Sequence, residues 1–279
     1  MKRILEFKRS IPAPDPALLR TVTVATDLSD HAGTVARYGA RLARLLGADL
    51  RLVHYQPSPV LIFPAAGESS LLPLEDAGVQ GRLSLLAAGL REDGLVIETE
   101  LAQGSPRQLA EQVDHKDLVV IGARRRRRLS MCFRPSLLAR LVAAGRCPVL
   151  VIPIGAESAP PTQLVYVEDA DSSVSATSAR HHAGMLAQRL GASLAVVRSS
   201  QAQGFDPTQS RTPLQTEMVL TRGDDRQGVL LVLPAFPSAS RVRRVAFEQM
   251  VRASPVPVLL VSSQALGTDE APKRSHPFS

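Results

Sequence analysis

The first half of the chain alternates short apolar runs with amphipathic segments. Five runs rich in Val, Ile and Leu have the composition of strands covered on both faces, and they span 21–26, 50–54, 96–101, 118–122 and 148–152. Between these runs, apolar residues recur at helical spacing. The alternation predicts a doubly wound, Rossmann-like α/β fold, in which a parallel sheet carries helices on both faces.

Capping residues mark the ends of the predicted helices. Ser29 or Asp30 is expected to cap the first helix, and Gly47 follows its last apolar residue. Ser136 predicts the start of a later helix, which Gly145 ends.

Two more helical segments complete the crossovers between strands. One spans about 73–94, and the other is a full helix that begins at Ser105 and Pro106 and carries Leu109 and Val113 on one face. With these two segments, strands and helices are predicted to alternate from residue 21 to residue 152.

The second half repeats the first in a shortened form. LARLLGADLRLVH at 42–54 aligns without gaps to LAQRLGASLAVVR at 186–198, and CPVLVIP at 147–153 returns as VPVLLVS at 256–262. The offset falls from 144 residues (186 minus 42) to 109 residues (256 minus 147), so the second copy lacks about 35 residues. The gap from Gly223 to the strand at Val229 is too short for a crossover helix, so a strand at 217–221 is expected to pair antiparallel or to lie at an edge.

These patterns predict two α/β domains, of which the second is reduced. The expected boundaries are a mobile basic N-terminal arm at 1–19, a first domain at 20–155, a linker at 156–162, a second domain at 163–264 and a disordered tail at 265–279.

Charge and composition narrow the expected partners. The net charge of +7 and the pI near 10.1 favour an anionic partner. Aromatic residues make up only 4% of the chain, which argues against specific nucleic-acid recognition by base stacking. No apolar run approaches the ~20 residues of a membrane span, and the N-terminal segment lacks the apolar core of a secretory signal, so the cytoplasm is the expected compartment.

The sequence contains no arrangement of residues that is typical of a catalytic or metal-binding site. Cys132 and Cys147 form no CxxC pair, and no histidine stands near them at ligand spacing. DLSDH at 27–31 contains the residue types of a hydrolase triad, but they are crowded into one turn, where a base can rarely be oriented against a nucleophile. We therefore expect a protein that is not an enzyme.

Residues 21–154 resemble the universal stress protein family in its tandem-domain form. The resemblance is carried by VATDLSDHAGTVARYGARLARLLGADLRLVHYQP, the GSP turn, DLVVIGA and SLLARLVAAGRCPVLVIP. In the second half it rests on Asp171, LGASLAVV, RGD and PVPVLLV. It implies a UspA-like protein of the stress response.

The resemblance also implies a nucleotide site. In nucleotide-binding members an aspartate ends the first strand, a residue after the second strand touches the adenine, and a G-x2-G-x9-G-S/T loop holds the phosphates. The matching positions here are Asp27, Tyr55, Gly122, Arg125, Pro135 and Ser136. Arg125 and Pro135 stand where the family has glycine, and proline fixes φ and lacks an N–H donor. We therefore expect a degenerate cleft with weak or no binding of ATP.

Five consecutive arginines, Arg124, Arg125, Arg126, Arg127 and Arg128, follow the strand at 118–122. They leave the carboxyl end of a strand ahead of a helix N-terminus, where guanidinium groups could grip the phosphates of ATP or another anion in place of the glycine loop. Like charges in a row repel one another, which favours a solvated loop, and the run could also be a surface that binds a polyanion or an acidic partner. The sequence leaves these interpretations open.

The apolar strands at 148–152 and 257–261 are expected to be edge strands, which tend to pair with another strand. In tandem members of the family such strands pair within one chain, so the resemblance implies an intramolecular pseudo-dimer. A homodimer of whole chains is a further expectation.

Overall fold

The computed structural model describes residues 19–56, 76–91, 95–105, 108–123, 136–156, 159–169, 175–199, 228–235 and 241–262. The structure does not describe Arg124–Arg128, Cys132, Pro135, residues 1–18 of the predicted arm, the predicted tail at 265–279, part of the predicted linker or the strand expected at 217–221.

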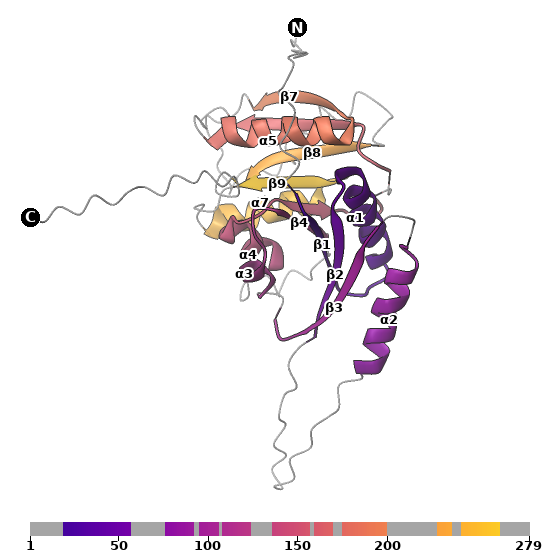
Figure 1. Ribbon diagram of the computed structural model, residues 1–279. Helices are drawn as coiled ribbons and strands as arrows, with labels where there is room; N and C mark the ends of the chain where they lie inside the picture. The colour runs from indigo at the N-terminus through magenta and orange to yellow at the C-terminus, as the bar shows by residue number, and fades with distance from the viewer. Residues whose placement is uncertain are drawn as a thin grey trace, which may run out of the picture.

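The described strands form a single nine-stranded sheet that runs through both halves of the chain (Figure 1). Their order is β3-β2-β1-β4-β5-β9-β8-β6-β7. The strands are β1 (Thr21–Thr26), β2 (Asp49–Gln56), β3 (Ile97–Gln103), β4 (Asp117–Gly122), β5 (Val149–Ile152), β6 (Gln163–Asp169), β7 (Ser193–Ser199), β8 (Val229–Ala235) and β9 (Val258–Ser262).

Neighbouring strands are parallel at every pair of this sheet except the pair formed by β5 and β9. At that pair Leu150 lies opposite Leu259, so the direction of the strands reverses between the two halves. The parallel pairing within each half confirms the predicted α/β class, because parallel strands need crossovers of the kind that the helices supply.

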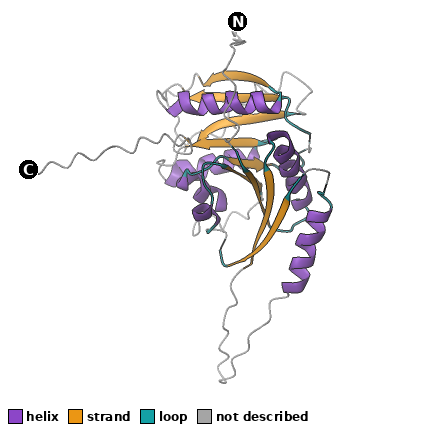
Figure 2. Ribbon diagram, in the orientation of Figure 1, coloured by secondary structure: helices purple, strands orange, loops and turns teal. Residues whose placement is uncertain are grey.

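Helices cover both faces of the sheet (Figure 2). One face packs against α1 (Ala32–Leu46), α2 (Asp76–Ala88) and α5 (Ser175–Leu190), and the other against α3 (Leu109–Gln112), α4 (Leu137–Ala144) and α7 (Arg241–Ala253). Strand side chains alternate between the two layers: Leu150 and Ile152 of β5 join the first core, and Val149 and Val151 join the second. Each fully buried Leu or Ile of this kind contributes about 1.5–3 kcal/mol of transfer free energy.

Helix α1 lies unusually close to β1 at Gly39. A Cβ atom at this glycine would overlap Cγ2 of Val24, so only a residue without a side chain lets the two elements approach to this distance. The approach fixes how α1 lies on the sheet and where its N-terminus falls.

The start of α1 differs from the prediction. The N-cap is His31, in helical conformation and without a side-chain capping bond, and not Ser29 or Asp30. The chain makes a tight turn here, in which the N–H of Ala32 bonds to the carbonyl oxygen of Ser29. Because the main chain satisfies that donor, no side-chain cap is needed.

The helix expected after Ser105 is also shorter than predicted. It spans only the four residues Leu109–Gln112 and ends at Val113, which has extended dihedral angles. Just beyond, Oδ1 of Asp114 accepts a hydrogen bond of 2.7 Å from the N–H of Lys116. Aspartate turns of this kind compete with helix continuation, which explains the early end.

Candidate functional site

The carboxyl ends of β2, β1, β4 and β5 lie next to one another at one edge of the sheet. Thr26 pairs with His54 across β1 and β2, and Gly122 pairs with Ile152 across β4 and β5. In open α/β sheets, ligands bind outside this edge. Asp27 follows β1 directly, and Gly122 ends β4, so both predicted site residues are at the expected place.

The loop after β1 is held by its own side chains. The N–H of Leu28 donates to Oγ1 of Thr26 at 3.1 Å, and the N–H of Ser29 donates to Oδ1 of Asp27 at 3.0 Å. Between them Leu28 has a φ of 54°, a left-handed conformation that few residues other than glycine adopt. Asp27 remains exposed to solvent, and at least one of its oxygens stabilises this turn.

Arg82 connects α2 to the same loop. Its Nη2 atom donates a hydrogen bond to the carbonyl oxygen of Leu28. A guanidinium group on a main-chain carbonyl makes a charge-assisted bond, which is stronger than a neutral one. Arg82 therefore helps to hold the left-handed turn that presents Asp27.

The imidazole of His31 covers the end of β4. A Cβ atom placed on Gly122 would come within 3.2 Å of His31 Cδ2 and 3.1 Å of Val35 Cγ2, so the glycine is closely covered by both residues. His31 Nε2 also lies 3.3 Å from the carbonyl oxygen of Ile152. The ring therefore occupies the space beside the first glycine of the predicted phosphate loop.

Ser136 begins α4, as predicted. Its Oγ accepts a hydrogen bond of 3.1 Å from the N–H of Ala139, and the residue is only 3% exposed. Gly145 ends the helix with a positive φ, which also confirms that boundary. The hydroxyl oxygen is thus engaged in capping, and the N-terminus of α4 lies on the face of the sheet opposite to α1.

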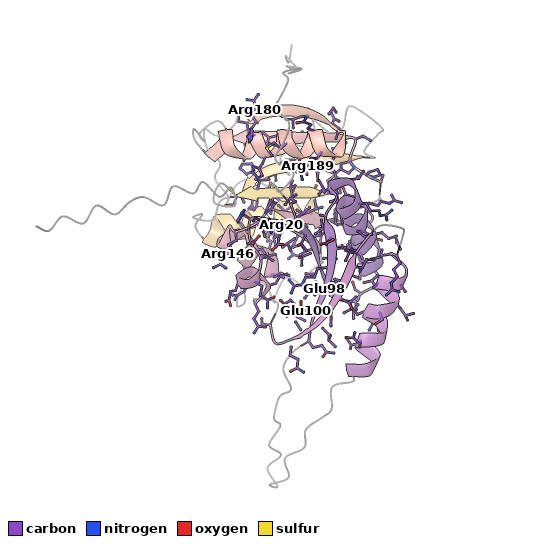
Figure 3. The ribbon with its side chains drawn as sticks, in the orientation of Figure 1. Arg20, Glu98, Glu100, Arg146, Arg180 and Arg189 are labelled. Carbon is purple, nitrogen blue, oxygen red and sulfur yellow. The ribbon has the colours of Figure 1, made fainter. Side chains whose placement is uncertain are left out.

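Tyr55 lies near the end of β2, on the same face of the sheet as α3. Its hydroxyl donates to Oε1 of Gln112 at 3.0 Å, and its side chain is half-buried. Burial raises the pKa of this hydroxyl, the charge of Glu100 raises it further, and Arg51 acts in the opposite direction. Arg51 itself is hydrogen-bonded to Glu100, which is labelled together with Glu98 on β3 in Figure 3.

Sequence reasoning missed His31, His54 and Arg82 as residues of this edge. His54 is half-buried near the end of β2, and its Nδ1 lies 2.9 Å from the carbonyl oxygen of Thr26. His31 precedes the buried Val35 by four residues and therefore lies in phase with the apolar stripe of α1, a signal that was present in the sequence. For Arg82 the sequence holds no comparable signal.

Within the described part of the chain, no group of three or more His, Cys, Asp and Glu side chains is arranged to hold a metal ion. None of its helices combines the length and the apolar character that a membrane span requires.

The first half of the chain is similar in sequence to known proteins. A family model described as the universal stress protein family matches residues 19–153. A relative from Thermus aquaticus, named universal stress protein in QAH/OAS sulfhydrylase 3′ region, is 33% identical over 141 residues, which cover 48% of this chain and 99% of the relative. A universal stress protein from Methanocaldococcus jannaschii is 28% identical over 141 residues, or 48% of this chain and 82% of that protein.

Similarity in fold extends over both halves. The crystal structure of a universal stress protein from Archaeoglobus fulgidus superposes with a TM-score of 0.63 at 14% identity, covering 92% of this chain and 100% of that one. At this identity the likeness concerns the fold alone.

Proposed function

The chain belongs to the universal stress protein family, and on this premise we propose that it is a non-enzymatic cytoplasmic protein of the stress response with weak or no affinity for ATP. The candidate site is the carboxyl-terminal end of the sheet, where Asp27, Gly122 and Ser136 lie. The observation that carries the proposal is the position of the His31 ring against Gly122.

A backbone cradle for phosphates needs close access to main-chain N–H groups. At Gly122 the His31 ring and Val35 restrict the access of a phosphate to the main chain. The sequence adds Arg125 and Pro135 at two positions where nucleotide-binding relatives have glycine. Both features act against the same mode of triphosphate binding, and they are independent of each other.

The predicted ligand groups also have partners within the chain. Asp27 accepts a hydrogen bond from the N–H of Ser29, Ser136 accepts one from the N–H of Ala139, and the Tyr55 hydroxyl donates to Gln112. A nucleotide would have to compete with these bonds or share them. This arrangement supports a structural role for each group.

A structural role is also what we propose for the two histidines of this edge. His31 and His54 each direct a ring nitrogen at a main-chain carbonyl oxygen, of Ile152 and Thr26 respectively. These contacts fix the orientation of both rings, which supports a structural role for them.

The two halves are proposed to be a tandem repeat whose second copy, at 163–264, is reduced. The order β7-β6-β8-β9 corresponds to β2-β1-β4-β5, and no described strand of the second half corresponds to β3. The antiparallel pair of β5 and β9 supports a pseudo-dimer within one chain, because it relates the halves by an approximate twofold axis. Such an arrangement uses the two apolar edges that would otherwise remain open.

Nucleotide content and titration test the proposed function together. A purified, denatured and deproteinised preparation is expected to be free of adenine nucleotide. A fluorescent ATP analogue, titrated at low and moderate salt, is expected to bind weakly and with strong salt dependence, and equally well to Asp27→Ala.

Saturable, salt-insensitive binding that Asp27→Ala abolishes would overturn the proposal. It would favour the alternative of a true nucleotide-binding module, in which Arg124–Arg128 replace the glycine loop. Replacing these five arginines by serine would then remove the binding as well.

A further inference from the structure

A small cavity lies at the junction of the two halves, at the end of the sheet opposite to the candidate site. Its volume is about 40 Å³. Leu19, Leu118 and Pro148 of the first half line it, and they stand at or just before the amino ends of β1, β4 and β5. The second half contributes residues of α5 and β9, among them His182, Leu259 and Val261. Ligand sites are often cavities between domains.

One polar atom of the cavity lining has no partner. Nδ1 of His182 is buried, and it has no hydrogen bond within the described residues. A buried polar atom without a hydrogen bond destabilises the fold, and a bound water or ligand is one way to satisfy it. Arg189, labelled on α5 in Figure 3, also lines the cavity but already takes part in an interaction within the chain. The ring of His182 is therefore the group that a ligand would satisfy.

The internal repeat offers a physical reason for the cavity. If the ungapped alignment of 42–54 to 186–198 is continued upstream by four residues, His182 stands opposite Tyr38, at the same offset of 144 residues (182 minus 38). Tyr38 is only 3% exposed, so in the first half a larger ring fills this position. The smaller histidine leaves room beside α5, and it adds a nitrogen atom that can bond to a molecule in that space.

We propose that this cavity is a binding site for a short-chain alcohol, whose hydroxyl group bonds to Nδ1 of His182 while its hydrocarbon chain lies against Leu118, Leu259 and Val261. The lining favours a neutral ligand, because burial lowers the pKa of His182 from 6.5 to about 4 and the ring is therefore neutral at pH 7. A hydroxyl group both donates and accepts, so it fits either tautomer of the neutral ring. The proposal goes beyond the proposed function and does not depend on the nucleotide site.

The volume and the apolar lining restrict the ligand further. A cavity needs at least about 10–15 Å³ to hold one water molecule, and this one has roughly three times that volume. An alcohol of about three or four non-hydrogen atoms, such as ethanol or propan-1-ol, matches this space. A sugar would bury hydroxyl groups without partners among the aliphatic side chains, and an ion would lose its hydration there.

Titration of the isotope-labelled full chain with propan-1-ol, followed by NMR of imidazole and methyl signals, tests the proposal. Saturable shifts are expected for His182 and for the methyl groups that line the cavity. The Kd is expected to be on the order of 1 mM, because so small a ligand cannot bind tightly. 1-Chloropropane has the same chain without the hydroxyl group, and it is expected to bind about fivefold more weakly.

Three variants separate the hydrogen bond from the space. His182→Leu removes the nitrogen atom, and it is expected to weaken binding of propan-1-ol by about fivefold and to leave binding of 1-chloropropane nearly unchanged. His182→Tyr introduces the residue of the first half, which is expected to fill the cavity and to abolish binding of both molecules. His181→Ser is the matched control, because His181 is exposed and does not line the cavity, and it is expected to bind both molecules like the unchanged protein.

Several outcomes would overturn the proposal. Equal affinity of the unchanged protein for propan-1-ol and 1-chloropropane would mean that the hydroxyl group is not recognised. Tighter binding of propionate than of propan-1-ol would mean that the site takes an anion. The absence of saturable shifts up to about 50 mM alcohol would leave water as the occupant of the cavity. Equal losses in His181→Ser and His182→Leu would place the binding elsewhere.

Discussion

His31 Nε2 lies 3.3 Å from the carbonyl oxygen of Ile152, and this contact ties the start of α1 to the end of β5. The same ring lies against Gly122 at the end of β4. One side chain therefore joins three elements at the edge where ligands of this fold class bind.

Replacing His31 by alanine is expected to lower the free energy of unfolding by about 1–2 kcal/mol, because a hydrogen bond and the packing of the ring are both lost. His31→Gln, which keeps a hydrogen-bonding group, is expected to lose less. Urea unfolding of the three proteins measures the difference. If His31→Ala were as stable as the unchanged protein, the ring would not be holding these elements together.

Gly39→Ala is expected to destabilise the protein by about 1–3 kcal/mol, since the added methyl group would overlap Val24 in a packed core. Gly33→Ala in the same helix is the matched control. Its methyl group would meet only the flexible end of Arg37, at 3.5 Å, and alanine favours the helix by about 1 kcal/mol over glycine. The two variants are compared by thermal unfolding. Equal effects would mean that the contact between α1 and β1 is looser than described.

Stability is expected to fall in acid because of His182. This residue lines a cavity of about 40 Å³ between α5 and β9, and its buried Nδ1 has no hydrogen-bond partner within the described residues. Burial lowers the pKa of His182 from 6.5 to about 4, and the neighbouring His181 acts in the same direction. Since the unfolded chain binds the proton more tightly, stability is present above the unfolded pKa and is lost as the pH falls from 6.5 toward 4.

At about pH 5 this loss is expected to reach about 1–2 kcal/mol relative to pH 7. His182→Leu is expected to remove it, while any acid destabilisation from other groups remains. Urea unfolding of both proteins at the two pH values gives the comparison. A pH dependence that His182→Leu leaves unchanged would show that this histidine does not titrate as described.

Cys147 is expected to be chemically inert in the folded protein. Burial raises the pKa of its thiol to about 12, and Asp117 and Asp114 add to the effect. In a Cys132→Ser background, which leaves one thiol, labelling by a thiol reagent at mild alkaline pH should proceed only as fast as the protein unfolds. Rapid labelling under native conditions would place this side chain outside the core.

The fold was largely predictable because strands covered on both faces leave a clear apolar signal. The run at 21–26 and β1 coincide, and Gly47 and Gly145 end their helices as predicted. The errors lie where short-range hydrogen bonds compete with periodicity. Asp114 helps to end α3 after four residues, and the turn at Ser29 makes a side-chain cap of α1 unnecessary.

The candidate site was only partly predictable. The places of Asp27 at the end of a strand and of Ser136 at the start of a helix follow from local features of the sequence, whereas their role in a nucleotide site was predicted only from the resemblance to the family. Arg82 was not predicted as a residue of the site. Its hydrogen bond to the carbonyl oxygen of Leu28 joins residues that are distant in sequence, and no sequence pattern indicates such a bond. His31 is in phase with Val35, but Ser29 and Asp30 are the residue types preferred at a helix N-cap, so the sequence predicted a helix start ahead of it.

The most direct test of the account is a crystal structure of the protein purified without added ligand and then soaked with ATP. We predict that the space between Asp27 and Ser136 will show no nucleotide, and that the His31 ring will lie over Gly122 with its Nε2 directed at Ile152. ATP bound along the main-chain N–H groups from 122 to 137, with the His31 ring displaced, would contradict the account.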